Sequence, residues 1–498
     1  MIEFERRVGF DNEKYLNMQS ERIRERISRF GGKLYMEFGG KLFDDFHASR
    51  VLPGFEPDSK LRMLLKLRDK AEIVIAVSAS ALARSKKRGD IGITYGQEVL
   101  RLADLFRAAG LYVGSVVVTQ YDGQPAADSF ISHLQSLGMP AYRHYLIEDY
   151  PADVRRIVSE EGFGKNDYIP TTRPLIVVTA PGPSSGKMAA CLSQLYQENK
   201  RGIKAGYAKF ETFPVWNLPL SHPVNLAYEA ATADLMDVNM IDPYHLEKYG
   251  KTTVNYNRDI EIFPVLEAMF REIYGKSPYS SPTDMGVNMA GMCIVDDDYV
   301  SLCSRQEIVR RYFQAACEQK KGRGRDEELR RLQVLMQKSG YGPQDYPAAA
   351  AAEAAHGQHG EPAAALELAD GTIITGRNKE MMGAASAMLL NALKYIAEIP
   401  DEVRLLSPEI LRAVQDLKVQ HLGNRNPRLH VKEALVVLSV SAAKNEDAAR
   451  ALKALPCLRR CSAHSSVILS EEDAAAFRRL GVNMTCTPQY SENRLYHG

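Results

Sequence analysis

The chain has 498 residues, of which 45% are hydrophobic and 25% charged, and 63 basic residues against 62 acidic ones give a net charge of +1. These values are typical of a globular protein and exclude the disordered and fibrous classes. The near-zero charge provides no general attraction to nucleic acid or to an anionic membrane, so neither partner is expected. The length predicts about three domains.

The amino-terminal sequence and the cysteines indicate the cellular compartment of the protein. The stretch MIEFERRVGF lacks the apolar core of a secretory signal, and no apolar run is long enough to span a bilayer. The seven cysteines are odd in number and thinly spread, which argues against a disulfide framework. We therefore expect a cytoplasmic protein. Zinc is not expected, since Cys457, Cys461 and His464 have no second Cys or His pair at zinc-like spacing.

Helical and strand-like segments alternate through the first part of the chain. Apolar, β-branched runs predict strands, and apolar spacing of three and four residues predicts helices between them. Strands with little polar alternation are typical of a parallel sheet that is covered on both faces. The sequence therefore predicts an α/β fold over residues 1–300, with a mainly parallel sheet and helices on both faces. The strands are expected at 71–80, 111–120, 141–147 and 174–180, and the helices at 98–110, 128–138 and 153–162.

The region 301–425 is predicted to be mainly helical. Two helices are separated by KKGRGR, which we interpret as a solvated turn rather than a phosphate contact. The Ala-rich stretch 347–365 is predicted to be a mobile surface linker with solvated histidines. Asp370-Gly371 between β-type flanks indicates a hairpin, and residues 426–498 alternate again, which predicts a small C-terminal α/β unit. The helices of this region are expected at 305–322, 326–340, 379–399 and 407–423.

The stretch IVVTAPGPSSGKMAA, residues 176–190, carries a strand into a Gly-containing turn and then into a helix. Free amides and the positive end of a helix dipole meet at such a turn, and an anion binds there readily. Gly182 and Gly186 permit close approach, Ser184 and Ser185 offer hydroxyl groups, and Lys187 supplies a charge. The sequence predicts a phosphate site here, with a tight turn beside an exposed lysine as the alternative.

The turn at 181–188 resembles a P-loop but departs from it twice. The pattern GxxxxGK[ST] would place its first glycine at Pro181 and its magnesium-binding hydroxyl at Met188. MCIVDDD (292–298) resembles the strand-plus-Asp element that holds Mg²⁺, so Asp296 is the candidate metal ligand, with a solvated turn as the alternative. The ligand would be ATP or another phosphorylated compound, with Mg²⁺ as the candidate metal.

A dense ionisable cluster lies at FGGKLFDDFHASRVLPGF, residues 38–55. Lys41 and Arg50 are candidate ligands for anionic groups, His47 is the candidate for proton transfer, and Asp45 is a further candidate catalytic residue, which would make this an active-site loop. A surface helix with compensating charges explains the same residues equally well.

Two further segments place polar groups at loop-to-helix junctions, where each could line a pocket at the carboxyl edge of the sheet. Helix capping is the favoured interpretation. They are residues 221–235, with His222 and Asn225, and residues 256–269, with Asn257, Arg258 and Asp259. No GxSxG, HExxH or post-strand GxGxxG occurs in the chain.

Four segments, EFGGKLFDDFHASRVLPGF, VVTAPGPSSGKMA, SPTDMGVNMAG and SAHSSVILS, together resemble a bacterial family known as a domain of unknown function. Its members are sometimes labelled ATP-dependent zinc proteases. The resemblance covers nearly the whole chain and implies an α/β amino-terminal part, a helical part and a smaller α/β unit. The sequence has no compact zinc signature, so the protease label is not adopted.

Three functions remain open from the sequence. The first is an enzyme that acts on a phosphorylated small molecule or nucleotide, by phosphoryl transfer or hydrolysis, with Lys187 and the loop amides holding phosphate. The second is a regulatory protein that senses a phosphorylated metabolite without chemistry. The third is an assembly protein, a homo-oligomer formed through the apolar helices between Lys379 and Gly423.

Overall fold

The computed structural model describes all residues except 1, 3–5, 40, 41, 89–91 and 492–498. By their internal contacts, the described residues form two units. The first to be described comprises residues 9–228 and 237–300, and the other comprises residues 1–8, 229–236 and 301–498.

A seven-stranded sheet forms the centre of the unit of residues 9–228 and 237–300. Its order is β4-β3-β2-β5-β1-β6-β9, and every neighbouring pair is parallel. The α/β class with a mainly parallel sheet is thus confirmed. The strands are β1 (Leu34–Phe38), β2 (Ala71–Ser78), β3 (Tyr112–Tyr121), β4 (Ala141–Tyr145), β5 (Leu175–Thr179), β6 (Gly206–Phe210) and β9 (Gly286–Val287), and β7 (Asn239–Ile241) pairs with β8 (Val254–Tyr256) beside it.

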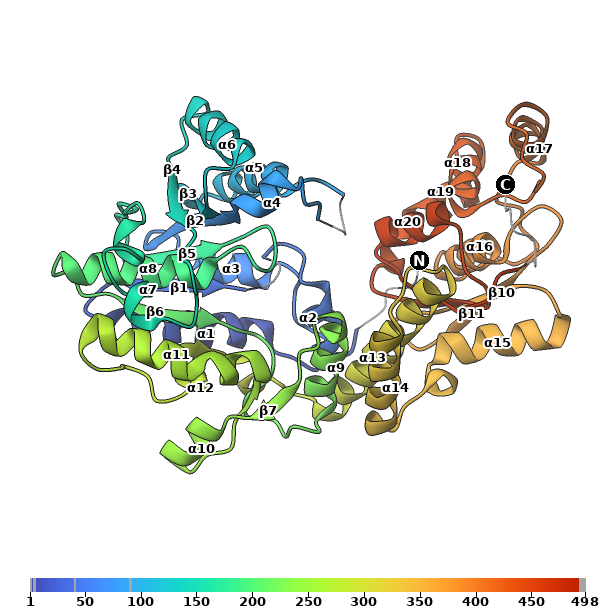
Figure 1. The fold of residues 1–498 in the computed structure, drawn as a ribbon. Helices are drawn as coiled ribbons and strands as arrows, with labels where there is room; N and C mark the ends of the chain where they lie inside the picture. Colours follow the sequence, from blue (N-terminus) through green and yellow to red (C-terminus); the bar gives the residue numbers. More distant parts are fainter. Residues whose placement is uncertain (1, 3–5, 40–41, 89–91, 492–498) are drawn as a thin grey trace. The chain divides into compact units, whose positions relative to one another are not determined.

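Helices cover both faces of this sheet. On one face, α8 and α11 bury apolar side chains against Tyr35, Val74 and Ile176, and the alternate residues of the same strands are buried on the other face. On that second face, α5 contacts β2 and β3, and α1 contacts β6 and β9 and packs against α3 (Figure 1). The helices are α1 (Asn12–Arg29), α2 (Phe46–Val51), α3 (Ser59–Leu65), α4 (Ala79–Ala83), α5 (Tyr95–Ala108), α6 (Pro125–Ser136), α7 (Val154–Ile157), α8 (Lys187–Lys200), α9 (Pro223–Ala231), α10 (Pro243–Tyr249), α11 (Asn257–Tyr274) and α12 (Pro282–Met285).

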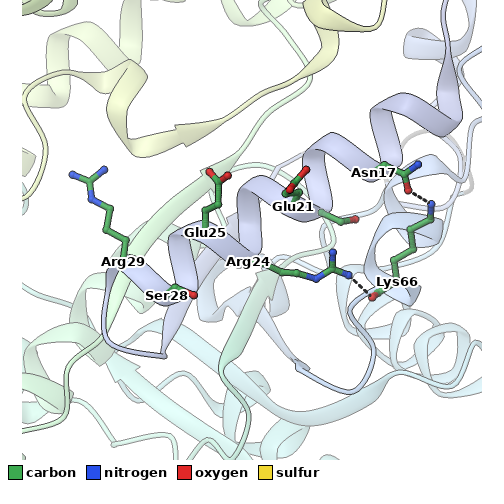
Figure 2. Close-up of a pocket in the computed structure, with 8 residues that line it drawn as sticks. Asn17, Glu21, Arg24, Glu25, Ser28, Arg29 and Lys66 are labelled. Atoms are coloured by element: carbon green, nitrogen blue, oxygen red, sulfur yellow. Dashed lines mark hydrogen bonds between the residues drawn. The ribbon is translucent and has the colours of Figure 1, made fainter.

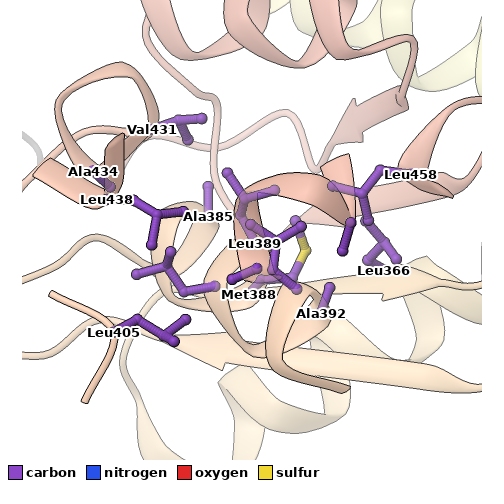
Figure 3. Close-up of a cluster of buried hydrophobic side chains, with 14 of the residues drawn as sticks. Leu366, Ala385, Met388, Leu389, Ala392, Leu405, Val431, Ala434, Leu438 and Leu458 are labelled. Carbon is purple, nitrogen blue, oxygen red and sulfur yellow. The ribbon is translucent and has the colours of Figure 1, made fainter. Parts of the chain in front are cut away.

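The other unit contains a four-stranded mixed sheet of order β11-β10-β12-β13. Only β12 and β13 run parallel, and β10 with β11 forms the predicted hairpin around Asp370-Gly371. Figure 3 shows the apolar cluster that joins this sheet to its helices, with Leu366 of β10 against Met388 and Leu389. The elements are α13 (Asp297–Lys320), α14 (Asp326–Ser339), α15 (Pro347–His359), β10 (Ala363–Glu367), β11 (Ile373–Arg377), α16 (Ala384–Ile396), α17 (Pro408–Asp416), α18 (Val431–Ser441), α19 (Glu446–Lys453), β12 (Ser462–Ser465), α20 (Glu471–Leu480) and β13 (Asn483–Cys486).

The Ala-rich stretch 347–365 is the main correction to the predicted elements, because it is a helix and a strand rather than a mobile linker. Alanine has the highest helix propensity, and Pro347 occupies the favourable first helical position of α15. Ala348 and Ala352 are buried, and the helix packs on β10. The low-complexity composition therefore led to a wrong prediction, because the segment 347–359 is an ordinary packed helix.

The stretch MCIVDDD is a second correction, because no strand forms there. Residues 290–292 make a short 3₁₀ turn, Ile294 makes an isolated bridge with Phe10, and α13 begins at Asp297. Cys293 is buried and Ile294 pairs with Phe10, whereas Met292 and Val295 are exposed, so the segment runs beside the amino-terminal segment instead of joining the sheet.

Candidate functional site

The strand order defines a switch point at the carboxyl edge of the parallel sheet. The chain leaves β2 toward β3, but it leaves the adjacent strand β5 in the opposite direction, across β1 to β6. Ligands of open α/β sheets bind in the crevice that such a divergence creates. The turn predicted to bind phosphate follows β5 and therefore lies at this point.

The turn between β5 and α8 has an unusual backbone. Ser184 and Gly186 both adopt left-handed conformations, with φ of 59° and 76°. Ser185 is buried, and its hydroxyl donates to the Gly182 carbonyl at 2.9 Å, while the Thr119 hydroxyl donates to the Ser185 carbonyl at 2.9 Å. These two hydrogen bonds fix the backbone of the turn between β5 and α8. Gly186 is the N-cap of α8, and the described residues provide no side-chain capping hydrogen bond there.

Lys187 directs its ammonium group to the end of β1. Its Nζ lies 3.7 Å from Glu37 Oε1, and the two side chains are 13% and 11% exposed. The Tyr207 hydroxyl donates to Glu37 Oε2 at 2.9 Å. The positive charge expected for phosphate is thus present beside the turn, and a carboxylate orients it.

A second charged cluster lies at the end of β6, on the far side of β1. Lys209 Nζ pairs with Asp259 and donates to the Tyr256 hydroxyl, and it lies 3.2 Å from Glu211 Oε1. Glu211 is 6% exposed and Asp259, in the first turn of α11, is 5% exposed. Two buried carboxylates therefore share one ammonium group.

This sharing perturbs the protonation of the cluster. Burial together with the charge of Asp259 raises the pKa of Glu211 to about 7, although Lys209 acts in the opposite direction. Burial alone would lower the pKa of Lys209, but Asp259, Tyr256 and Glu211 hold that pKa well above its ordinary value. The cluster thus keeps a charged lysine beside a carboxyl group that titrates near neutral pH.

Trp216 lies against the same carboxyl group. A Cβ built on Gly286 of β9 would meet the Trp216 indole at 2.4 Å and Glu211 Oε2 at 3.1 Å, so both side chains adjoin this glycine. Within the described part of the chain, neither Glu211 Oε2 nor Trp216 Nε1 has a hydrogen-bond partner. An acceptor and a donor without hydrogen-bond partners thus belong to two side chains that both adjoin Gly286.

The predicted cluster at 38–55 contains one residue that stabilises a helix and another that lies near the loop after β6. Asp45 caps α2 through the Ala48 amide at 3.1 Å and pairs with Lys60 at 2.8 Å. Burial would raise the pKa of Asp45, but Lys60 holds it below its ordinary value. Asp45 therefore holds α2 in place.

His47 has the site-facing position in this cluster. Its ring lies 5.3 Å from the ring of Phe213, two residues beyond Glu211, and Phe213 stacks on Tyr228, which borders Tyr256. Arg50 lies in the last turn of α2, and Lys41 falls outside the described residues. The structure thus brings His47 to the β6 loop.

Asp296 occupies a helix cap. Its Oδ1 accepts from the Tyr299 amide at 3.0 Å, at the start of α13. Among the described residues, no three His, Cys, Asp or Glu side chains gather as metal ligands would. The magnesium role of Asp296 stays a prediction.

The other polar junctions are mainly structural, with one exception. Asn225 bonds both backbone groups of Val215, Asn257 accepts from the Val238 amide, and Arg258 pairs with Asp237 at 2.6 Å. Asp259, by contrast, belongs to the Lys209 cluster. The sequence analysis did not predict three residues of this edge, namely Glu37, Lys209 and Glu211. A Lys-x-Glu pair at the end of an apolar strand would have indicated Lys209 and Glu211.

Two pockets lie elsewhere on this unit. Figure 2 shows one of about 800 Å³ along α1, where side chains of both signs are spread along the helix and Lys66 donates to Asn17 at 2.6 Å. This is a solvated helix face. A second, of about 370 Å³, lies between α4, α5 and α6 and is lined by Tyr95, whose hydroxyl adjoins Gly182 of the turn. Tyr95 therefore lies both at this pocket and beside the turn.

The fold and this edge define a doubly wound α/β protein with a Gly-containing strand-to-helix turn at its switch point. None of the helices in the described ranges combines the length and the apolar character needed to cross a bilayer.

Comparison with known sequences identifies the family. Residues 8–340 match "Domain of unknown function DUF1846, N-terminal" and residues 344–496 match its C-terminal counterpart. The chain belongs to this family, as its motifs predicted. UPF0371 proteins of Streptococcus thermophilus (strain ATCC BAA-250 / LMG 18311) and Streptococcus sanguinis (strain SK36) are each 56% identical over 491 residues, and one of Streptococcus pneumoniae serotype 19F (strain G54) is 55% identical, with 99% of each chain covered in all three.

Proposed function

We propose that the protein is an enzyme acting on a phosphorylated small molecule or nucleotide whose phosphate binds at residues 182–187. The supporting observation is the turn after β5, in which two residues have left-handed backbone conformations. The turn leads into a 14-residue helix that begins at Lys187 and has no side-chain capping hydrogen bond among the described residues. Backbone amides, the helix dipole and an ammonium group together favour a dianion. The position of the turn at the switch point of the sheet favours a ligand rather than a simple connection.

Glu37 has a defined role in this proposal. Without ligand it neutralises Lys187 and keeps the lysine directed over the edge. An incoming phosphate would compete with Glu37 for the ammonium group, so binding exchanges one anion for another instead of burying a new charge. The candidate Mg²⁺ ion would neutralise part of the phosphate charge, and its ligand stays the predicted Asp296.

Binding can be followed with the intrinsic fluorescence of Trp216, the single tryptophan of the chain. The probes are pyrophosphate, inorganic phosphate, AMP, ATP and glucose 6-phosphate, each with and without Mg²⁺. Lys187→Ala should weaken binding about 10- to 100-fold, since a charge-assisted contact contributes about 1.5–3 kcal/mol. Lys200→Ala, at the exposed opposite end of the same helix, should bind as the wild type does. Equal affinity in Lys187→Ala and the wild type would refute the proposal.

A sensor without chemistry is the alternative, and product analysis separates it from an enzyme. Ligands that bind in a Lys187-dependent way are incubated with the protein, and their consumption is followed by phosphorus NMR. Conversion supports the enzyme, whereas binding without conversion supports the sensor. The self-association predicted for the helices between Lys379 and Gly423 is tested independently by light scattering at several concentrations.

A further inference from the structure

The cluster at the end of β6 has an excess of negative charge for a buried site. Glu211 and Asp259 face a single ammonium group, Lys209, and Glu37 adds a further carboxylate nearby. Structural ion pairs in protein interiors are stabilised by matched charges and by satisfied hydrogen bonds. This cluster does not meet the first condition, since two buried carboxylates face a single cation.

A matched cluster in the same unit shows what a structural arrangement looks like. Glu198, at the other end of α8, is fully buried and faces the ammonium group of Lys33. The hydroxyls of Tyr35 and Tyr168 donate to the same oxygen at 2.6 Å and 3.3 Å. Among the described residues, this carboxylate faces one cation and two hydroxyl donors through one oxygen, while its Oε2, like that of Glu211, has no hydrogen-bond partner. The two clusters therefore differ in their balance of charge, one carboxylate for one cation against two for one.

The Glu211 cluster is continuous with the phosphate turn. Lys187 contacts Glu37, Tyr207 donates to Glu37, and Tyr207 and Lys209 stand on the same face of β6. Neighbouring strands lie about 4.8 Å apart, so the ends of β5 and β6, with β1 between them, are roughly 10 Å apart. That spacing suits one small phosphate ester, with its phosphate at the turn and its other end at Glu211.

We propose that Glu211 is a catalytic acid–base group acting on the non-phosphate end of a small phosphorylated substrate, with Lys209 and Trp216 as its partners. This inference rests on the proposed phosphate site. The substrate class is a phosphate monoester of a few carbons that carries a hydroxyl or carbonyl group. Trp216 Nε1 donates to that oxygen, and Glu211 Oε2 faces the proton to be moved.

The proton transfer needs no further reactant. Glu211 Oε2 forms a bond to the substrate proton, the electron pair of the broken bond stays on the substrate, and the Lys209 ammonium compensates the negative charge. Asp259 keeps the lysine charged and in position. The reverse step returns the proton from the carboxyl group, so atoms and charge balance. A carboxyl group with a pKa of about 7 exchanges protons in both directions at neutral pH.

An affinity label tests this geometry without knowledge of the natural substrate. The probe is glycidol phosphate, whose phosphate would bind at the turn and whose epoxide would reach toward β6, together with its longer homologue carrying one more methylene group. Attack by the Glu211 carboxylate on an epoxide carbon forms an ester, breaks the ring C–O bond and leaves an alkoxide that takes a proton from Lys209. Peptide mapping by mass spectrometry locates the ester.

We expect Glu211 to be labelled at least 100-fold faster than Glu198, a buried glutamate beside a lysine and tyrosines at the opposite edge. The rate should rise as pH increases through about 7, because the carboxylate is the nucleophile. Pyrophosphate should protect Glu211, Lys187→Ala should slow its labelling at least tenfold, and Lys200→Ala should not. Glu211→Gln should remove the label while pyrophosphate binding persists.

The outcomes separate this inference from the proposed function. If pyrophosphate binds through Lys187 but Glu211 is not labelled by either probe, the inference is overturned and the phosphate site stands. Labelling of Glu211 that does not depend on Lys187 also overturns it, because the two ends would not belong to one site. If pyrophosphate does not bind, the proposed function fails and this inference fails with it.

Discussion

The two edges of the parallel sheet treat buried charge differently. At the amino edge, Glu72 accepts the amides of Thr172 and Arg173, and Glu198 faces Lys33, so each buried carboxylate has its own donors. At the carboxyl edge, Glu211 and Asp259 compete for one lysine, and Lys187 is held by Glu37 across the mouth of an uncapped helix. The contrast teaches that burial of charge is not itself a functional signal. An excess of buried carboxylates over cations is a stronger signal, because the unbalanced charge destabilises the fold.

The largest expected difference between the edges comes from removing their lysines. Lys209→Met leaves two buried carboxylates without a cation and should cost about 3–5 kcal/mol of unfolding free energy. Lys33→Met leaves Glu198 with two tyrosine donors and should cost about 1–3 kcal/mol. Urea unfolding at pH 8, followed by Trp216 fluorescence, measures both. Equal costs would remove the contrast between the edges.

The pH dependence of stability is the next test. The pKa of Glu211 is raised from 4.5 to about 7 by folding, so the folded state binds more protons than the unfolded state between these values. The contribution of Glu211 to stability is therefore fully present below pH 4.5 and is lost as the pH rises through 7. Glu211→Gln does not titrate, so its stability relative to the wild type should improve by about 2–3 kcal/mol between pH 5 and pH 8. A difference that is constant with pH would show that Glu211 is ionised throughout.

Gly286→Ala should have a smaller effect, centred on the same carboxyl group. The added methyl group would lie 2.4 Å from the Trp216 indole, so the ring must move away from Glu211. We expect a loss of about 1–3 kcal/mol and a shifted fluorescence emission. Gly39→Ala is the control, since a Cβ there meets nothing within 4 Å. An unchanged emission spectrum in Gly286→Ala would contradict the contact between Trp216 and this strand.

The smallest effect concerns the phosphate turn. Ser185→Ala removes the hydrogen bond from Ser185 to the Gly182 carbonyl and should cost about 1 kcal/mol. Ser184→Ala alters an exposed hydroxyl and should change stability by less than about 0.5 kcal/mol. Unfolding curves for the two variants, with pyrophosphate titrations beside them, show whether Ser185 holds the turn. Identical curves would mean that the turn keeps its shape without this bond.

Local pattern was sufficient for much of the fold. The strands at 71–80, 111–120 and 174–180 and the helix at 98–110 were predicted close to their observed bounds, because continuous β-branched runs and regular apolar spacing depend on nearest neighbours alone. The Ala-rich segment was misjudged, since composition does not reveal that Ala348 and Ala352 pack on β10. The prediction of a strand before Asp296 was also wrong. The seven-stranded sheet ends at β9, and local composition does not reveal where a sheet ends.

The sequence alone determined the α/β class, the family and the Gly-containing turn between a strand and a helix at 182–187, since each depends on contiguous residues. That this turn binds phosphate stays a prediction. Only the tertiary structure decided that Lys209, Glu211 and Asp259 meet, that Glu37 holds Lys187, and that Trp216 adjoins Gly286. These residues come from separate strands, loops and helices. Their convergence depends on the order of strands in the sheet, which is set by packing over the whole unit rather than by any local pattern.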